Sequence, residues 1–244
     1  MRRSELIREK VEFTADLLAE LYGTPKLRRP EPAKILDVLI ATKLSQNTTD
    51  KSSYKAFTQL RSLGSWEEIA RTKETDIRHS IKVCGLANTK AKDIKIMLGE
   101  LLAKFGTLDL RFMRDFDNET IYKELLSLRG IGVKTASCVL VFALGRDVFP
   151  VDTHVHRVLN RLGIAKTSTA EKTFSEVSEI IPEGRKYELH TNLIKFGRNI
   201  CRAVNPHCSA CGLYEICTIK ERKKRKSMKS VSASENNFLI LEEI

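Results

Sequence analysis

Four cysteines near the end of the chain have the type and spacing of metal ligands. Cys201, Cys208, Cys211 and Cys217 form the pattern C-x6-C-x2-C-x5-C within seventeen residues. Four thiolates so close in sequence can surround one metal centre, and the C-x2-C pair lets two of them reach it together. Zinc and an iron–sulfur cluster both accept four thiolates, so the spacing leaves the choice of metal open. Since four ligands complete the coordination, we expect a structural site.

A second group of residues, LRGIGVKTA at 128–136, combines a glycine turn with a charged side chain. A helix, a tight turn over Gly130 and Gly132 and a second helix form a predicted helix–hairpin–helix unit. Backbone N–H groups of such a turn, at a helix N-terminus, can bind a phosphate without reading base sequence. Lys134 stands at the start of the second helix, and Asp152 opens the next helix eighteen residues later. Each has a structural alternative: an exposed helical lysine and an N-cap aspartate.

The helical spacing of apolar residues predicts an all-α fold with short connections. A first helix is expected to end at Tyr22, with one apolar face that contains Leu6, Ile7, Val11, Leu17, Leu18 and Leu21. Pro30 and Pro32 open a second helix, and the polar segment 45–50 caps a third. Further helices are expected within 66–83 (two short ones), 89–105, 118–128, 133–144, 152–162, 170–181 and 184–200.

Composition narrows the class of protein. The chain has 244 residues, 42% of them hydrophobic, and a formal net charge of +11, which favours a polyanionic partner. No apolar run approaches the roughly 20 residues of a membrane helix, and the N-terminus lacks an apolar signal core. We therefore expect a cytoplasmic or nuclear protein that is not secreted. Cys84 and Cys138 lie in apolar stretches and are expected to be reduced core residues.

The last 25 residues differ in character from the rest. Residues 220–229 contain seven Lys or Arg and one Glu, and the polar stretch SVSASENN follows. This composition predicts that the tail, 220–244, is disordered. Its end, FLILEEI, is apolar beside acidic residues. Two alternatives remain for it: a docking peptide for a protein partner, or a frayed terminus.

Together these motifs resemble the endonuclease III family of DNA repair glycosylases, within the helix–hairpin–helix-GPD superfamily. The resemblance rests on LRGIGVKTA, on VFPVDTH with Pro150 and Asp152, and on the cysteine spacing; it extends through LIATKLSQNTTD and CGLANTKAKDI, over roughly residues 30–217. It implies a six-helix barrel over 28–147 and a second domain, 1–27 with 148–219, that holds a [4Fe–4S] cluster. The resemblance thus favours iron–sulfur over zinc.

The same resemblance implies a reaction. The substrate is double-stranded DNA with a damaged base or an abasic site, bound by a monomer away from any membrane. Lys134 would attack C1′ of the sugar and displace an oxidised pyrimidine, and β-elimination would then cut the strand. Asp152 would stabilise positive charge on the sugar. Two alternatives remain: a glycosylase for mispaired or deaminated pyrimidines, and a non-catalytic DNA-binding module, which would need neither residue.

Two loops match the places where the family inserts side chains into DNA. Asn47 occupies the position that fills the hole left by a flipped nucleotide, where a glutamine is common. This chain has Gln46 one residue earlier, so the identity of the inserted residue stays open. Leu86 matches a wedge against the opposite strand; its alternative is a buried core leucine.

Three basic residues complete the expected DNA contacts. His154 either reaches a phosphate or the base pocket, or is an ordinary helix-surface histidine. Arg198 and Arg202 flank the first cysteine of the cluster and would be presented to the phosphate backbone by that loop. Their alternative is a solvated charged face.

Overall fold

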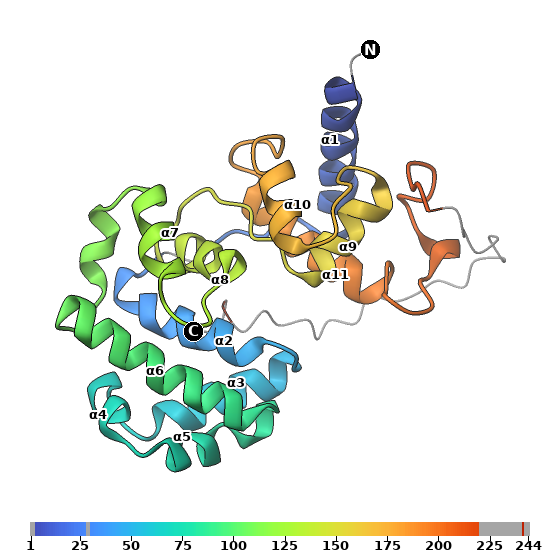
Figure 1. The fold of residues 1–244 in the computed structure, drawn as a ribbon. Coiled ribbons are helices and arrows are strands. Elements are labelled where there is room, and N and C mark those ends of the chain that lie inside the picture. Colours follow the sequence, from blue (N-terminus) through green and yellow to red (C-terminus); the bar gives the residue numbers. More distant parts are fainter. Residues whose placement is uncertain (1–2, 28–29, 220–240, 242–244) are drawn as a thin grey trace. The chain divides into compact units, whose positions relative to one another are not determined.

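The computed structural model describes residues 3–27, 30–219 and 241, without the side chain of Ala33. This part of the chain contains eleven α-helices with short 3₁₀ and π-helical segments and no strand, so the all-α prediction is confirmed (Figure 1). The described residues form two compact units. The first contains 3–26 and 147–219, and the second contains 27, 30–146 and 241. The part of the tail within 220–240 and 242–244 lies outside the described residues.

The second unit is built around helix α2 (Ile35–Ser45), whose sequence is apolar on every side. A helix of that kind must be surrounded, and α2 packs against α3 (Asp50–Arg61), α6 (Ala87–Phe105) and α8 (Val133–Cys138). The remaining helices of this unit are α4 (Trp66–Arg71), α5 (Glu74–Ser80) and α7 (Asn118–Leu126). Helix α8 continues as one π-helical turn, Val139–Ala143.

Polar side chains cap three helices of this unit. Thr49 caps α3 by accepting a hydrogen bond from the Ser52 amide, which confirms the predicted polar break before that helix. Ser65 and Glu68 form a reciprocal capping box at α4, and Asp117 caps α7. Each cap satisfies amides that the first turn of a helix leaves without a partner.

The first unit combines the N-terminal helix with residues 147–219. Helix α1 (Arg3–Tyr22) packs against α11 (Lys186–Asn199), α11 packs against α9 (Thr153–Leu162), and α9 contacts α10 (Ala170–Val177). The buried amide of Asn192 donates to the carbonyls of Leu18 and Gly23 at 3.3 and 2.9 Å and so closes the end of α1. A 3₁₀ turn, Cys208–Ala210, lies within the cysteine segment.

The predicted buried face of the first helix, α1, is partly wrong. The apolar face predicted for the first helix included Leu6 and Leu21, but these side chains are 47% and 54% exposed. The buried residues of α1 are Val11, Thr14, Ala15 and Leu18. These four follow the i, i+3, i+4, i+7 rule, and their narrow strip matches the single helix, α11, against which α1 chiefly packs.

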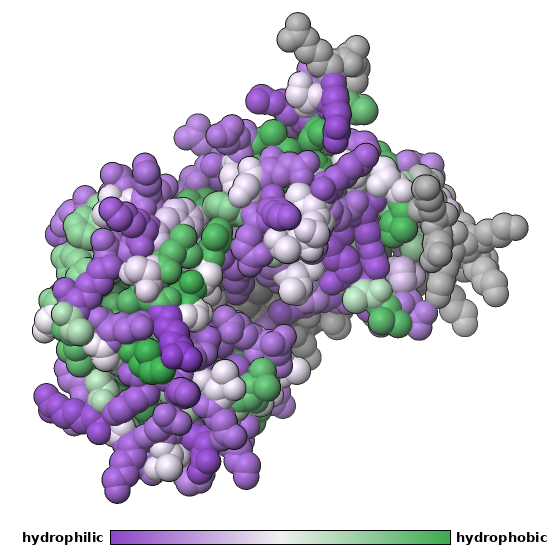
Figure 2. All heavy atoms as spheres, in the orientation of Figure 1, coloured by the Kyte–Doolittle hydropathy of each residue, from purple (hydrophilic) through white to green (hydrophobic). Residues whose placement is uncertain are grey.

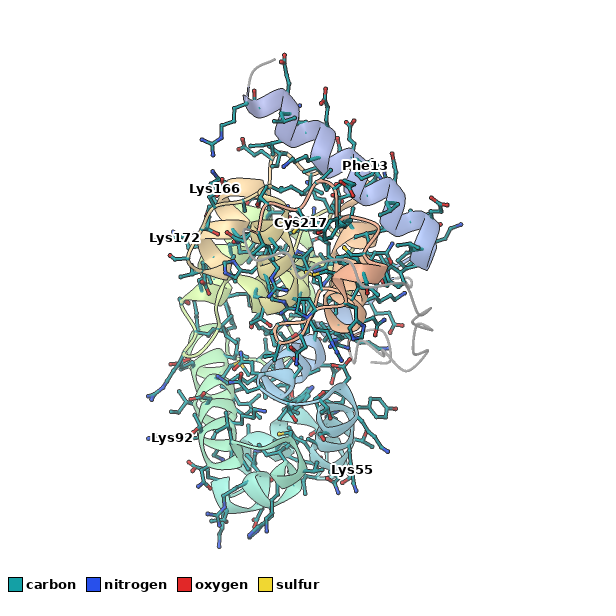
Figure 3. The ribbon with its side chains drawn as sticks, turned by 90° about the vertical axis from the view of Figure 1, so that its right-hand side faces the viewer. Phe13, Lys55, Lys92, Lys166, Lys172 and Cys217 are labelled. Atoms are coloured by element: carbon teal, nitrogen blue, oxygen red, sulfur yellow. The ribbon has the colours of Figure 1, made fainter. Side chains whose placement is uncertain are left out.

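The surface of both units is mainly polar. Figure 2 shows hydrophilic residues over most of the visible face of the described chain, with hydrophobic residues in small separate patches. Figure 3 shows lysines that project outward from each unit, among them Lys55, Lys92, Lys166 and Lys172, all of which are exposed. No helix of the described residues is long and apolar enough to cross a membrane.

Candidate active site and cysteine cavity

The glycine hairpin between α7 and α8 has the backbone that its sequence predicts. Gly130 has φ +75°, in the left-handed region where a side chain is strained. Gly132 is extended and forms the N-cap of α8 without a side-chain cap. Both glycines are exposed, whereas Ile131 between them is 7% exposed and anchors the turn in the core. The backbone of the hairpin is therefore exposed to solvent, while the buried Ile131 side chain holds the turn against the core.

A buried ion pair lies behind this hairpin. Lys43 of α2 is 7% exposed, and its Nζ lies 2.7 Å from Asp93 Oδ2 of α6 and 3.5 Å from the Gly130 carbonyl oxygen. A Cβ at residue 130 would lie 2.8 Å from Lys43 Nζ. Sequence reasoning missed this lysine, because its partners are distant in the chain; the one available signal was a lysine inside an otherwise apolar helix.

Lys134 is the second residue of α8 and is half-buried. Within the described residues, no hydrogen bond or ion pair engages its Nζ. The alternative of a fully exposed helical lysine is therefore wrong. An amine that is partly withdrawn from water and lacks a protein partner is free to meet a ligand.

Asp152 in the first unit caps α9. Its Oδ1 accepts hydrogen bonds from the amides of His154 and Val155, both at 2.8 Å. The N-cap alternative is thus present, yet it uses only one carboxylate oxygen. Among the described residues no hydrogen bond reaches Oδ2, so half of this partly buried group stays available to a ligand.

The segment that leads to Asp152 is held by a buried histidine. Phe149 and Val151 are 1% and 2% exposed, and Nδ1 of His190, on α11, lies 2.8 Å from the Pro150 carbonyl oxygen. The rings of Phe149 and His190 meet edge to face. His190 was not found from the sequence, since a histidine in an apolar helix gives no sign of a backbone partner forty residues away.

His154 is half-buried rather than a plain surface residue. Arg157 Nη2 lies 3.1 Å from its Nδ1, and Gly197 of α11 leaves room for it, since a Cβ there would lie 3.0 Å from His154 Cβ. Burial lowers the pKa of His154, against a smaller opposing effect of Asp152. At neutral pH the ring is therefore uncharged and is no cation for a phosphate.

Both loops expected to enter DNA belong to the second unit and are exposed. Gln46 and Asn47 face solvent after the end of α2, and Asn47 has φ +53°. Leu86 is 58% exposed with φ +50°, so the alternative of a buried core leucine is wrong. An exposed leucine in a left-handed conformation is unusual and is typical of functional positions.

The four cysteines of the first unit meet at one cavity of about 30 Å³, lined by Cys201, Cys208, Cys211 and Cys217 with Arg161, Pro206, His207, Tyr214 and neighbours. All four are half-buried, and none of them forms a disulfide within the described residues. Burial raises the pKa of Cys211 to about 12, with contributions from the other three thiols. Within the described ranges, no three His, Cys, Asp or Glu side chains lie close enough together to hold one metal ion.

Two arginines contact residues of the cysteine segment. Arg161 donates to Cys201 Sγ at 3.4 Å, and its own carbonyl accepts from Cys217 Sγ at 3.4 Å. Arg202 is exposed, with its Nη2 2.7 Å from His207 Nε2, and Arg198 is half-exposed at the end of α11. The guanidinium groups of Arg161 and Arg202 therefore contact the cysteine segment. Cys84 and Cys138, as predicted, are core residues of the other unit, and neither forms a disulfide within the described chain.

Fold and site together define the class of helical DNA-repair proteins with a helix–hairpin–helix unit. A family model described as "HhH-GPD superfamily base excision DNA repair protein" matches residues 40–183, so the chain belongs to this superfamily. It is 35% identical to endonuclease III of Thermotoga maritima over 194 residues, 79% of this chain and 87% of that protein. To endonuclease III of Sulfolobus acidocaldarius it is 34% identical over 187 residues, 75% and 81% of the two chains.

Solved structures of endonuclease III also match the fold of this chain. A non-covalent endonuclease III–DNA complex matches with a TM-score of 0.73 and 26% identity, over 86% of this chain and 95% of that one. The chain spans 60% of the length of one Arabidopsis thaliana relative, to which it is 37% identical over 177 residues. The protein is accordingly an endonuclease III-like DNA glycosylase of the superfamily, and the resemblance found in the sequence is confirmed.

Proposed function

We propose that the protein is a bifunctional DNA glycosylase and abasic-site lyase that excises oxidised pyrimidines. The observation that carries the proposal is that Lys134, a half-buried residue directly after an exposed glycine hairpin, has an amine without a protein partner among the described residues. A structural neighbour with a TM-score of 0.73 and 27% identity is a trapped endonuclease III–DNA covalent intermediate, which supports a covalent mechanism.

Lys134 acts as the nucleophile and Asp152 as its electrostatic partner in the reaction. The target nucleotide leaves the duplex so that its sugar becomes accessible. As the bond from C1′ to the base breaks, the Asp152 carboxylate stabilises positive charge on the sugar. The neutral Lys134 amine bonds to C1′, and the base departs with a proton. The C1′–O4′ bond then breaks, O4′ takes a proton from the nitrogen, and C1′ and the lysine nitrogen form an imine. The imine acidifies the C2′ proton, whose loss expels the 3′ phosphate.

Exposed backbone and side chains bind the DNA around this reaction. The amides of Gly130 and Gly132 bind a phosphate, and Arg198 and Arg202 add positive charge near the cysteine loop. Gln46 or Asn47 fills the space of the flipped nucleotide, and Leu86 presses against the opposite strand. His154, which is neutral, contributes a hydrogen bond toward the nucleotide rather than charge.

The cysteine residues fit a [4Fe–4S] cluster. Thiolates are the ligands that such clusters take, and all four cysteines line one cavity. A single zinc ion with Zn–S bonds of about 2.3 Å would need sulfurs roughly 4 Å apart. The preference for the cluster over zinc rests on the resemblance to the endonuclease III family. When bound, the cluster ties Cys201 to Cys217 and supplies a fixed loop for the neighbouring arginines.

The proposal includes the domain roles and the setting. Residues 28–147 form the six-helix barrel with the hairpin, and 1–27 with 148–219 form the cluster domain. The protein works as a monomer in the cytoplasm or nucleus, away from membranes. The segment FLILEEI in the tail is the candidate docking peptide for a protein partner.

Borohydride trapping on a duplex with an abasic site tests the proposal. Borohydride reduces an imine, so wild type should become covalently attached to DNA and Lys134→Ala should not. Lys92→Ala removes an exposed lysine of the same unit and should trap like wild type. Trapping that persists in Lys134→Ala would assign the nucleophile elsewhere. Excision of a base without any adduct in wild type would make the protein a monofunctional glycosylase.

A panel of duplexes then tests the substrate. Single-turnover excision is measured with thymine glycol, uracil and a mispaired thymine, each in the same sequence context. We expect thymine glycol to react fastest. Faster release of uracil or mispaired thymine would favour the alternative of a glycosylase for deaminated or mispaired pyrimidines.

A further inference from the structure

The unit that contains the hairpin has a second buried lysine besides Lys43. Lys90 lies in the first turn of α6 and is 2% exposed. Its Nζ donates to the carbonyl oxygens of Leu44 at 2.8 Å and Cys84 at 3.1 Å, and lies 3.6 Å from Cys84 Sγ. Three acceptors match the three hydrogens of an ammonium group. Burial lowers the pKa of Lys90, so the position disfavours the charge that it holds.

The two carbonyls belong to the ends of two different loops. Leu44 lies in the last turn of α2, directly before the exposed Gln46 and Asn47. Cys84 ends the 3₁₀ turn Lys82–Cys84 and is two residues before Leu86. Lys90 is therefore bonded to the base of both loops that the proposed function inserts into DNA.

Both loops contain a strained residue. Asn47 and Leu86 have φ +53° and +50°, and Asn205 is the one further non-glycine residue with positive φ in the described parts of the chain. Left-handed residues other than glycine persist where their surroundings determine the backbone. Here the Lys90 side chain helps to determine the backbone of two loops that are forty residues apart in sequence.

The same helix offers a matched comparison. Lys95 lies between one and two turns further along α6, is half-buried, and donates to the carbonyls of Ala70 and Thr72, the latter at 2.6 Å. It closes the end of α4 in the way that Lys90 closes the end of α2. No residue of that turn belongs to the loops proposed to contact DNA. Lys95 thus makes the same kind of hydrogen bonds to backbone carbonyls as Lys90, but away from the loops proposed to contact DNA.

We propose that Lys90 is a positioning residue. It fixes the loop of Gln46 and Asn47 and the turn of Leu86 relative to each other, so that both enter the duplex together. The inference rests on the proposed function of these two loops. It predicts that the loops act together on DNA only while Lys90 joins them, and that a damaged or missing base, which leaves room for insertion, is recognised through this joint action.

A double-mutant cycle tests the proposal. Gln46→Ala, Leu86→Ala and the double variant are made in wild type and in Lys90→Met, and Kd is measured at fixed salt for a duplex with a tetrahydrofuran abasic site. In the wild-type background we expect the two effects to be non-additive by about threefold or more in Kd. In the Lys90→Met background we expect additivity. Lys90→Met itself should weaken abasic-site binding by about tenfold and undamaged-duplex binding far less, since phosphate contacts remain.

Two controls make the outcome decisive. Lys95→Met should preserve both the abasic-site preference and the coupling of the loops. Lys90→Gln, which keeps an N–H donor, serves if Lys90→Met does not fold by circular dichroism. Coupling that survives the loss of Lys90, or that is absent in wild type, would overturn the inference alone. A wild-type protein that does not prefer abasic over undamaged duplex would overturn the proposed function of the loops and the inference with it.

Discussion

Lys43 and Asp93 form an ion pair of 2.7 Å directly behind the glycine hairpin, and the Lys43 ammonium occupies the space that a side chain at residue 130 would need. Both partners are largely buried, at 9% and 15% side-chain exposure. Removing one partner of such a pair leaves an uncompensated buried charge. The hairpin and the central helix of the unit are therefore mechanically linked through one amine.

Gly130→Ala should destabilise the protein by about 1–3 kcal/mol, because a non-glycine residue at φ +75° is strained and its Cβ displaces Lys43. Chemical unfolding measures the loss, and DNA affinity should fall with it. Gly132→Ala is the matched control, since Gly132 is extended and a Cβ there meets nothing within 4 Å. Equal effects of the two substitutions would contradict the role of the ion pair.

Asp152→Asn should lose base excision by roughly 10²–10⁴-fold while it keeps stability and DNA affinity. Asparagine caps a helix as well as aspartate does, so the bonds to the amides of His154 and Val155 can persist. Asp152→Ala should also lose about 1 kcal/mol of stability, because it removes the cap. Single-turnover excision, unfolding and Kd separate these effects. A loss of binding in Asp152→Asn as large as the loss of excision would show that the carboxylate acts in binding.

Cys208→Ser should lower the iron content of the purified protein and weaken its folding or DNA affinity more than its intrinsic chemistry. The reason is that all four cysteines line one cavity and each is a ligand of the proposed cluster. Cys138→Ala, which changes a buried cysteine outside the cavity, should retain iron. Iron analysis and visible absorbance provide the measurement. A Cys208→Ser protein with full iron content and normal stability would end the assignment of this ligand.

His154→Gln should make the protein less sensitive to mild acid. Burial lowers the pKa of His154 from 6.5, so below that pH the unfolded chain binds a proton that the folded chain does not. Stability contributed by the neutral ring is therefore present above pH 6.5 and lost as pH falls through 6.5 toward the folded pKa. Urea unfolding at pH 7.5 and 5.5 should show a smaller difference for His154→Gln than for wild type. His79→Gln, at an exposed histidine, should behave as wild type.

The affinity for DNA should fall linearly with salt on logarithmic axes, because Lys and Arg that bind phosphates release counterions. Arg198→Ala and Arg202→Ala should each reduce the slope by about 0.9, the value for one phosphate contact. Arg111→Ala is a control, since Arg111 is exposed and engages Asp109. Fluorescence titrations from 50 to 300 mM salt give the slopes. Unchanged slopes for both variants would place the phosphate contacts on other residues.

Much of the fold could be predicted because its signals are local. Apolar spacing predicted the helices, and Thr49 and Asp152 begin two of them with caps that the sequence analysis named. The cysteine pattern likewise needs only near neighbours. The buried face of α1 was predicted less well, because Leu6 and Val11 are equally apolar in sequence and only the position of α11 separates them.

The supporting residues of the site could not be predicted. Lys43, Lys90 and His190 lie in apolar helices, where a charged or polar residue is usually solvated. Their partners include the backbone carbonyls of Gly130, Leu44 and Pro150, and every residue type has a carbonyl. A sequence therefore contains no mark of which carbonyl a buried side chain will reach. Such contacts appear only once distant segments are folded together.

The pairing of α1 with α11 has a consequence for synthesis of the chain. The ribosome makes α1 first, but its partner helix, which also supplies Asn192 to its end, begins only at Lys186. Residues 30–146 contain all the helices of their own unit and can fold while the chain is still growing. Helix α1 therefore cannot pack until α11 has been made, when the other unit can already be folded. The cysteine segment is made after all of the helices α1 to α11. The proposed cluster would thus be inserted late in maturation, after the hairpin has formed.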